Sequence, residues 1–428
     1  MRRDGHRSRN INVQRMTALL PFVADVASAQ VLAPPRPPAA SVPDPPARDT
    51  RLDIVRGWLQ VTIFVSHAAT TWLHGWLVYG AWGLSDSSEQ FVFLSGYVLG
   101  SVFARRAARL GWVDAARDML RRALLLYRTQ LVLFTMFGAM VVLADRSGLR
   151  PGEIERLGWD VMLRDPVHAI PAALAMLYLP SFMDILPLFV WGMLLLPGFA
   201  ALERALGPFA LLAPFALYAG VQFAGLQPPF LDGHAGTGFN PFAWQMLFLL
   251  GAFLGRRVLL TGRKLPVMPW LTEAAVMIIV AGVALRLGWY GVLPWAIPVS
   301  PDLPVFDRRG LGLAVVVHAL ALAWLVSHCV PRHAAWMECK PLRWLAAAGR
   351  QSLQVFCLGL FLSWATDTAI QMWPAWWLEP LVIAAGVAAL LYFAWQTDRR
   401  RPTSRTAPAN PAAACAAAKG SRASAVRL

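Results

Sequence analysis

A single apolar segment near the start of the chain carries charged and polar residues at helical spacing. It runs from Arg51 to His67 (RLDIVRGWLQVTIFVSH) and is apolar enough to enter a bilayer. In an α-helix, Arg56 and His67 lie about three turns apart on one face, roughly 16 Å along the axis. Gln60 lies on that face as well. Because a charged side chain near the centre of a bilayer costs at least about 2.5 kcal/mol, this polar face must turn toward protein or water. The segment is therefore the first candidate for a functional site.

Composition places the chain among polytopic helical membrane proteins. Of its 428 residues 57% are hydrophobic and only 15% are charged. The apolar residues form blocks of about 20 residues, the length of a membrane helix, separated by short polar loops. The net charge of +15 comes mainly from arginines beside these blocks and in the two tails, which favours positive-inside topology over nucleic-acid binding. The 4 cysteines have neither metal-binding nor redox spacing, so we expect no metal site, no cofactor and no disulfide framework.

The distribution of basic residues predicts the topology. We expect about ten membrane spans with both termini in the cytoplasm, because the outside loops 74–88, 226–241 and 371–377 then contain no Lys or Arg. The apolar run 167–182 is broken by prolines, and an additional span there would place a basic loop outside, so it is predicted to be re-entrant or interfacial. The arginine-rich segment 105–122 is predicted to be an amphipathic helix on the membrane surface. The predicted spans are 53–73, 89–104, 123–144, 186–202, 207–225, 242–259, 271–290, 311–330, 350–370 and 378–396.

The chain is expected to form one membrane domain between two tails. Residues 1–50, basic and then proline-rich, and residues 399–428, rich in Arg, Pro, Ala and Ser, are predicted to be disordered cytoplasmic tails. Residues 51–398 form the predicted all-α membrane domain. It shows no convincing internal repeat, which disfavours the inverted-repeat transporter architectures.

The polar segment suggests acid–base chemistry. The imidazole of His67 is a natural general base, and the Arg56 guanidinium can hold a phosphate or carboxylate with two hydrogen bonds. The structural alternative is that Arg56 reaches the membrane interface and His67 bonds a neighbouring helix. Glu89 is a further catalytic candidate, for acceptor binding or orientation of a histidine, unless it only complements a helix dipole. The candidate substrate-binding residues are Asp53, Gln60, Asp184, Arg128, Gln245 and Arg350; the structural alternatives are a turn for Asp184, helix–helix contacts for Arg128 and Gln245, and an interfacial anchor for Arg350.

A series of motifs occurs in order along the chain. The motifs are RLDIVRG at 51–57, Ser66-His67, EQFVFLSGY at 89–97, RRAARLGW at 105–112, YLPSFMDILP at 178–187, FNPFAWQ at 239–245 and GRQSLQVFCLG at 349–359. Together they resemble the OpgC family over roughly residues 50–395. The resemblance implies a membrane protein that succinylates osmoregulated periplasmic glucans and is related to the acyltransferase-3 superfamily.

The resemblance also assigns roles to residues of the polar segment. Arg56 and His67 match the arginine–histidine pair of that superfamily, with His67 as the implied catalytic base. In the family an Asp or Asn often precedes the histidine, whereas this chain has Ser66. Any mechanism that needs a carboxylate there would have to use Glu89, Asp53 or Asp184.

These features predict a membrane O-acyltransferase in the cell inner membrane. The expected donor is a cytoplasmic acyl-CoA, with succinyl-CoA as the first expectation, and the expected acceptor is a hydroxyl of a periplasmic glucan or similar saccharide. His67 would remove the hydroxyl proton, and an acyl-histidine intermediate is left open. The alternatives are a transporter of a saccharide or anionic metabolite that uses the same polar face, and a non-catalytic scaffold.

Overall fold

The computed structural model describes residues 49–68, 78–231, 238–262, 266, 268–293, 299–331 and 334–400. Every regular element among these residues is a helix, which agrees with the predicted all-α class. The two predicted tails lie almost entirely outside the described residues. Their disorder and the cytoplasmic placement of both termini therefore stay predictions.

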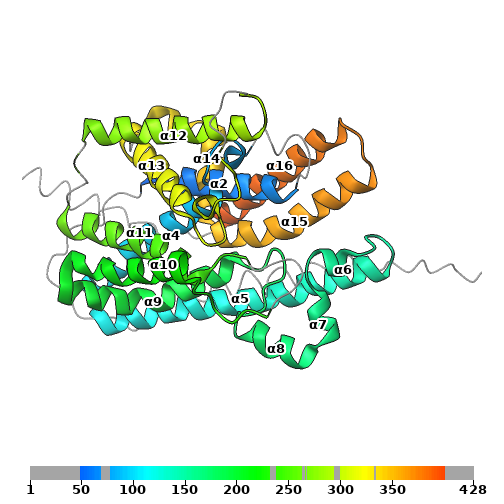
Figure 1. Cartoon of the computed structure of the whole chain (residues 1–428), viewed down its shortest axis with the longest axis horizontal. Helices are drawn as coiled ribbons and strands as arrows, with labels where there is room; N and C mark the ends of the chain where they lie inside the picture. Colours follow the sequence, from blue (N-terminus) through cyan, green and yellow to red (C-terminus); the bar gives the residue numbers. More distant parts are fainter. Residues whose placement is uncertain are drawn as a thin grey trace, which may run out of the picture.

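The helices follow one another through short connections (Figure 1). The α-helices are α2 (Thr50–Ala68), α4 (Ser87–Leu110), α5 (Trp112–Arg146), α6 (Glu153–Arg156), α7 (Asp160–Arg164), α8 (Pro166–Leu174), α9 (Ile185–Leu206), α10 (Leu212–Ala224), α11 (Pro241–Thr261), α12 (Pro269–Trp289), α13 (Leu313–Cys329), α14 (Lys340–Arg350), α15 (Ser352–Met372) and α16 (Leu378–Arg400). The short 3-10 helices are η2 (Tyr79–Ala81), η3 (Gly207–Leu211), η4 (Pro304–Phe306) and η5 (Ala335–Glu338).

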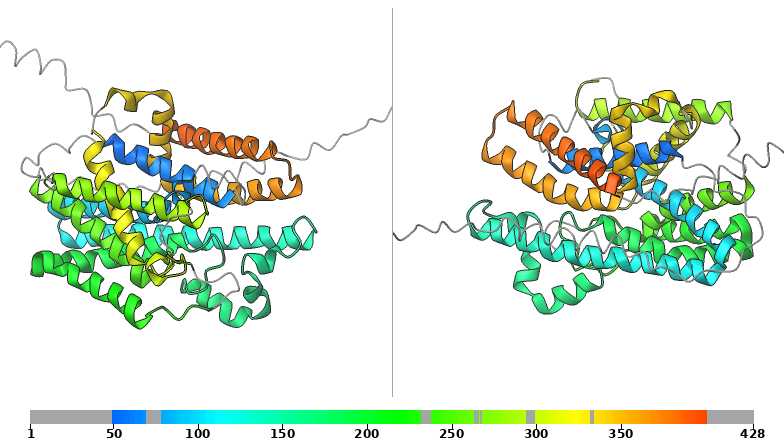
Figure 2. Two further views of the ribbon diagram at one scale, coloured as in Figure 1. Left: turned by 45° about the horizontal axis from the view of Figure 1, so that its top comes forward. Right: turned by 180° about the vertical axis from the view of Figure 1, so that it is seen from behind.

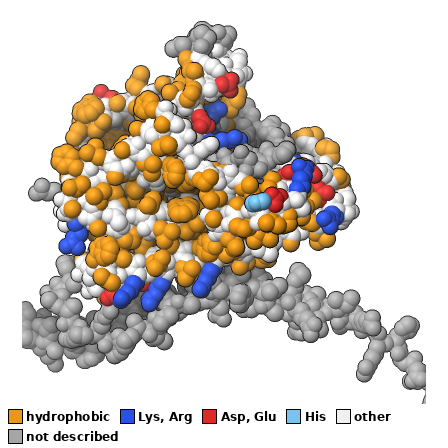
Figure 3. Space-filling model, turned by 60° about the horizontal axis from the view of Figure 1, so that its bottom comes forward, with side chains coloured by type: hydrophobic (Ala, Val, Ile, Leu, Met, Phe, Trp, Pro, Cys, Tyr) orange, Lys and Arg blue, Asp and Glu red, His pale blue; other side chains and the backbone are white. Residues whose placement is uncertain are grey.

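Six segments of the described chain are long and apolar enough to cross a membrane: α5, α9 together with α10, α11, α12, α15 and α16. The other predicted spans fall on α2, α4 and α13. Of these, α13 is apolar but has only 17 residues, and α2 carries Arg51, Asp53 and Arg56. Hydrophobic side chains cover most of the face seen in Figure 3, with charged ones mostly toward its edges, as expected of a surface that meets lipid. The chain is thus a polytopic helical membrane protein, while the number of ten crossings stays a prediction.

The helices form two layers, seen from opposite sides in Figures 1 and 2. One layer holds α2 with α12 to α16, and the other holds α5, α9 and α10. Helix α4 contacts α2 in the first layer and α5 and α9 in the second, so it joins the two. This arrangement places the polar helix α2 inside the molecule.

Glycines allow α4 and α11 to pack backbone against backbone. A Cβ atom on Gly96 or Gly100 of α4 would overlap the backbone of α11, and one on Gly251 or Gly255 would overlap the backbone of α4. Small residues four positions apart are the usual means by which membrane helices approach this closely. The four glycines therefore set the distance between these two helices.

A second close contact joins α2 to α14. Gly57 of α2 leaves no room for a Cβ beside the carbonyl of Leu345, and Gly349 of α14 leaves none beside the carbonyl of Asp53. Both helices can approach only because both residues are glycine. The contact brings Arg350 and the first turn of α15 to the beginning of α2.

Two predictions about segments between the spans have different outcomes. The predicted surface helix 105–122 is wrong, because α4 continues to Leu110 and the chain turns at Gly111 directly into α5. Gly111 has φ +89°, a conformation that residues other than glycine rarely adopt, and this permits the sharp turn. In the run 167–182, α8 has only 9 residues, about half the length needed to cross a bilayer, which agrees with the absence of a predicted span there.

Candidate functional site

Helix α2 places Arg56 and His67 on one face, as their spacing predicts. The axial separation of roughly 16 Å divides the site into two parts. The His67 end of α2 is its last turn, where the His67 side chain is exposed. The Arg56 end packs on α14, where Gly57 meets the Leu345 carbonyl, and contacts the start of α15 through Ser352.

At the His67 end, the imidazole is held by the helix that carries it. Its Nδ1 lies 2.8 Å from the carbonyl oxygen of Ile63, one turn earlier. Since a carbonyl can only accept, Nδ1 carries the proton and donates it, and Nε2 keeps its lone pair in the neutral ring. The Ser66 hydroxyl donates to the same carbonyl at 2.8 Å and lies 3.1 Å from Nδ1. These contacts leave Nε2 as the ring nitrogen of His67 that can accept a proton.

The turn before α9 reaches the same histidine from the other layer. The ring of Phe182 lies 5.2 Å from the imidazole, centre to centre. Phe182 has φ +72°, which a bulky residue adopts only where its surroundings hold it there. Two contacts hold it: the Gln130 amide of α5 donates to the carbonyl of Met183 at 2.9 Å, and Phe137 packs on the Phe182 ring at 5.3 Å.

Asp184, at the end of this turn, is the carboxylate that senses the charge of His67. Burial raises the pKa of Asp184 above its ordinary value, and the charge of a protonated His67 acts against that rise. The charge of a protonated His67 thus favours the ionised form of Asp184. Of the three carboxylates proposed from the sequence, the structure brings Asp184 to the histidine.

At the Arg56 end, side chains from three other helices come together. Arg56 Nη2 donates to Ser352 Oγ at 2.6 Å, where α15 begins. Asp53, one turn earlier, is buried under α14. Arg350 makes hydrogen bonds to both carboxylate oxygens of Asp398 in α16, at 2.6 to 3.1 Å. The predicted residues Asp53, Arg56 and Arg350 thus lie in one region of the protein.

Amide side chains near this region bear buried polar atoms without a hydrogen-bond partner among the described residues. They are Nε2 of Gln60 on α2, Oε1 of Gln351 beside α15 and Oε1 of Gln354 on α15. Such groups are costly to bury unless something bonds them. They mark the α2–α15 interface as a place where a polar ligand or water can be held.

The remaining predicted residues lie in other surroundings. Glu89 is buried and its Oε2 accepts from the backbone N–H of Asp86 at 2.7 Å, which completes a cap on α4. Arg128 is exposed on α5. The Gln245 amide donates to the carbonyls of Pro214 and Phe242 at 3.1 Å each, so it makes a contact between α10 and α11. The geometries of Glu89 and Gln245 agree with their structural alternatives, whereas the exposed position of Arg128 does not show the helix–helix contact stated for it.

No cluster of three or more His, Cys, Asp or Glu side chains suited to a metal ion occurs among the described residues. The site therefore consists of one prepared histidine, a nearby aspartate and, roughly 16 Å away, an arginine region. A candidate proton acceptor at one end of α2 is thus separated from a group of charged and polar side chains at the other.

The chain belongs to the OpgC family. The family model described as OpgC protein matches residues 48–402, which include every helix from α2 to α16. No curated protein and no solved structure matches the chain. The relation to the acyltransferase-3 superfamily stays a prediction.

Proposed function

We propose that this protein is a membrane O-acyltransferase that modifies a glucan, as membership of the OpgC family suggests. The observation that carries the proposal is the His67 imidazole, whose Nδ1 proton is fixed on the Ile63 carbonyl and whose Nε2 is left as the base. Asp184 beside it supplies a negative charge when the ring becomes protonated.

The reaction follows from these groups. His67 Nε2 removes the proton of an acceptor hydroxyl while the hydroxyl oxygen attacks the thioester carbonyl of the donor. The C–S bond breaks, and the imidazolium returns its proton to the leaving thiolate. Asp184 stabilises the imidazolium between these two steps. The products are an ester on the saccharide and a free thiol.

The distance between the two ends decides the role of Arg56. An arginine roughly 16 Å away along the helix cannot contact the oxygen that becomes negative next to His67. It can hold a distant anionic part of the same donor, with Ser352 and Arg350 nearby. We therefore assign Arg56 to donor binding rather than to stabilisation of the transition state.

Donor and acceptor follow from topology. If the Arg56 end faces the cytoplasm, as the positive-inside rule favours, the donor is a cytoplasmic acyl-CoA and His67 faces the periplasm of an inner membrane. Succinyl-CoA and a periplasmic glucan are the first substrates to test.

The decisive experiment measures transfer with purified protein in vesicles, using labelled succinyl-CoA and periplasmic glucan. We expect His67→Ala to abolish transfer, whereas His168→Ala, at an exposed histidine paired with Asp165, should leave it unchanged. Mass spectrometry of glucans from cells with and without the gene identifies the acyl group. Wild-type transfer by a folded His67→Ala protein would refute the proposal, and unmodified glucan in all cells would favour the transporter.

A further inference from the structure

A cavity of about 770 Å³ lies beside α2 and is separate from the acyl-transfer site. Its walls come from α2, α4, α11, α12 and α13, and neither Arg56 nor His67 lines it. On α2 it is lined by Leu52, Val55 and Leu59, which at 100° per residue occupy a different face from the polar stripe. The cavity therefore requires an explanation of its own.

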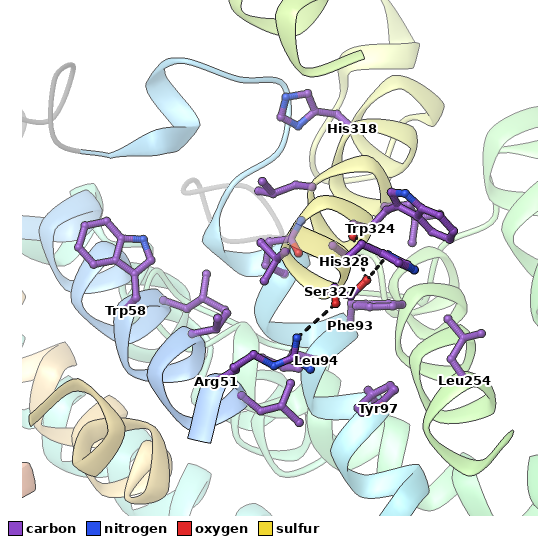
Figure 4. Close-up of a pocket in the computed structure, with 18 of the residues that line it drawn as sticks. Arg51, Trp58, Phe93, Leu94, Tyr97, Leu254, His318, Trp324, Ser327 and His328 are labelled. Atoms are coloured by element: carbon purple, nitrogen blue, oxygen red, sulfur yellow. Dashed lines mark hydrogen bonds between the residues drawn. The ribbon is translucent and has the colours of Figure 1, made fainter. Parts of the chain in front are cut away.

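Polar groups lie at the two ends of this cavity (Figure 4). Arg51, Tyr97, Ser327 and His328 gather at one end, called here the Arg51 end. At the other end His318 packs between two glycines, with its Nδ1 held by the Ser85 hydroxyl at 2.7 Å. The rest of the lining is mainly aliphatic and aromatic, with the Gln90 amide as a further polar group; it includes Leu59, Leu94, Leu250, Leu254, Val283 and Leu320.

The length of the cavity matches one leaflet of a membrane. His318 and His328 both line it and are ten residues apart on α13, about 15 Å along the axis. The hydrocarbon core of a bilayer is about 30 Å thick, so one lipid chain spans about half of it. Trp58, which also lines the cavity, has 48% of its surface exposed, so the wall is incomplete toward the outside of the bundle.

The lining disfavours occupants other than an alkyl chain. Water needs two to four polar partners, whereas most of the lining is apolar and the Gln90 amide already donates to the Ala319 carbonyl. The linear arm of an acyl-CoA contains amide groups, and amides buried there would lose their hydrogen bonds to water without replacement. An alkyl chain has no hydrogen bonds to water to lose, and it makes the van der Waals contacts that the lining would lack if the cavity were empty.

We propose that the cavity binds one acyl chain of a membrane phospholipid, with the head group at the Arg51 end. The Arg51 guanidinium is already committed to Asp49 and to the carbonyls of Ser327 and Val330. Head-group contacts are therefore left mainly to His328, whose Nδ1 lies 2.9 Å from the Trp324 carbonyl. The site consequently selects for the chain and discriminates little between head groups. The bound chain supports the face of α2 adjacent to the polar stripe.

Native mass spectrometry of the full-length protein in a mild detergent tests the proposal without any assay of acyl transfer. We expect the wild-type protein to retain phospholipid and Ala323→Trp, which fills the cavity, to lose it. Val317→Trp is the matched control on the same helix, since Val317 is 40% exposed and does not line the cavity. Equal retention by wild type and a folded Ala323→Trp protein would overturn the proposal.

Photolabelling of the wild-type protein provides a measurement independent of any variant. In vesicles of phosphatidylethanolamine and phosphatidylglycerol, a trace phospholipid with a photoreactive group on its chain should label the peptides around Leu94 and Ala323. Excess succinyl-CoA should not reduce this labelling. Displacement by succinyl-CoA would assign the cavity to the donor instead, and absence of label from these peptides would likewise refute lipid binding. Either result would leave the assignment of His67 intact.

Discussion

At the scale of single residues, a backbone carbonyl orients the His67 ring, where a carboxylate was expected. The residue before His67 is Ser66, and the proton on Nδ1 is fixed by the carbonyl of Ile63. A carbonyl orients the ring as a carboxylate would but carries no full negative charge. Asp184, from the turn before α9, is the carboxylate whose pKa responds to the charge of a protonated His67. In the proposed mechanism, orientation and charge are therefore divided between the Ile63 carbonyl and Asp184.

Ser66 should therefore matter little for catalysis. In Ser66→Ala the hydrogen bond from Nδ1 to Ile63 remains, and only a neutral hydrogen bond worth about 0.5–1.5 kcal/mol is lost. We expect kcat to fall by about tenfold or less in the vesicle assay. A loss as complete as that of His67→Ala would show that the hydroxyl, not the carbonyl, prepares the ring.

Asp184→Asn should lower activity without lowering the stability of the fold. Because burial raises the pKa of Asp184, its ionised form costs folding free energy at neutral pH, and the amide removes that cost. The variant should thus unfold at the same or a higher temperature than wild type at pH 7. The difference should vanish below about pH 4, where the carboxyl is protonated in both states.

Transfer by Asp184→Asn should decrease, since the imidazolium loses its neighbouring charge. If the lost interaction stabilises the transition state by about 1.4 kcal/mol, kcat falls roughly tenfold. Thermal unfolding followed by intrinsic fluorescence and kcat measured on the same preparation check both parts. Unchanged kcat would remove Asp184 from the mechanism.

Part of this site can be predicted from the sequence, because residues on one face of a helix are close together in the chain. Arg56, Gln60 and His67 can be placed on one face from the 3.6-residue period alone. Phe182 and Ser352 contact them from distant parts of the chain, and nothing in their own neighbourhoods indicates which helix they will meet. Asp398 could not be predicted either, because it ends an apolar helix and looks like an ordinary interfacial charge.

At the scale of helices, hydropathy locates the apolar segments but not their contacts. The predicted ranges fall on observed helices, and the predicted surface helix failed because a positive-φ glycine turns α4 directly into α5. The loop predicted before the ninth span contains α14, whose glycine contact with α2 could not be inferred from charge. Packing by small residues depends on which helices meet, and a single sequence does not state that.

The glycine contact between α4 and α11 gives a prediction at this scale. In Gly96→Ala the new methyl group would overlap the Phe248 carbonyl, and a backbone atom cannot move aside as a side chain can. We expect destabilisation of about 1–3 kcal/mol and a lower yield of monodisperse protein by size-exclusion chromatography. Gly198→Ala on α9 is the matched control, because its Cβ would meet nothing within 4 Å. Equal behaviour of the two variants would contradict the close packing.

At the scale of the molecule, a buried charge cluster connects the loop after α5 to α15. Glu153 of α6 accepts from Trp364 Nε1 at 2.7 Å and from Arg156 at 2.6 and 2.7 Å. Asp367 of α15 accepts from Arg150 at 3.2 Å. The turn that carries Phe182 is attached to the same loop, since Ser181 N–H donates to the Leu157 carbonyl at 2.9 Å. The cluster thus helps to hold the turn that carries Phe182 in place beside His67.

Glu153→Gln should therefore affect both stability and transfer. Although burial alone would raise it, the hydrogen bonds from Arg156 and Trp364 and the nearby arginine charges hold the pKa of Glu153 below its ordinary value. A lowered pKa means that the carboxylate stabilises the folded protein above about pH 4.3, and that this stability is lost as the pH falls through the folded-state pKa. We expect a loss of about 3 kcal/mol at pH 7 and a smaller loss near pH 4.

The same variant tests whether the loop positions the site. Glu155→Gln on the same short helix is the control, because Glu155 is exposed and its replacement should change neither property. Transfer by Glu153→Gln should fall below wild type even at temperatures where the protein stays folded, since Phe182 and Asp184 are then held less firmly against His67. If transfer fell only in proportion to the folded fraction, the cluster would stabilise the molecule without positioning His67.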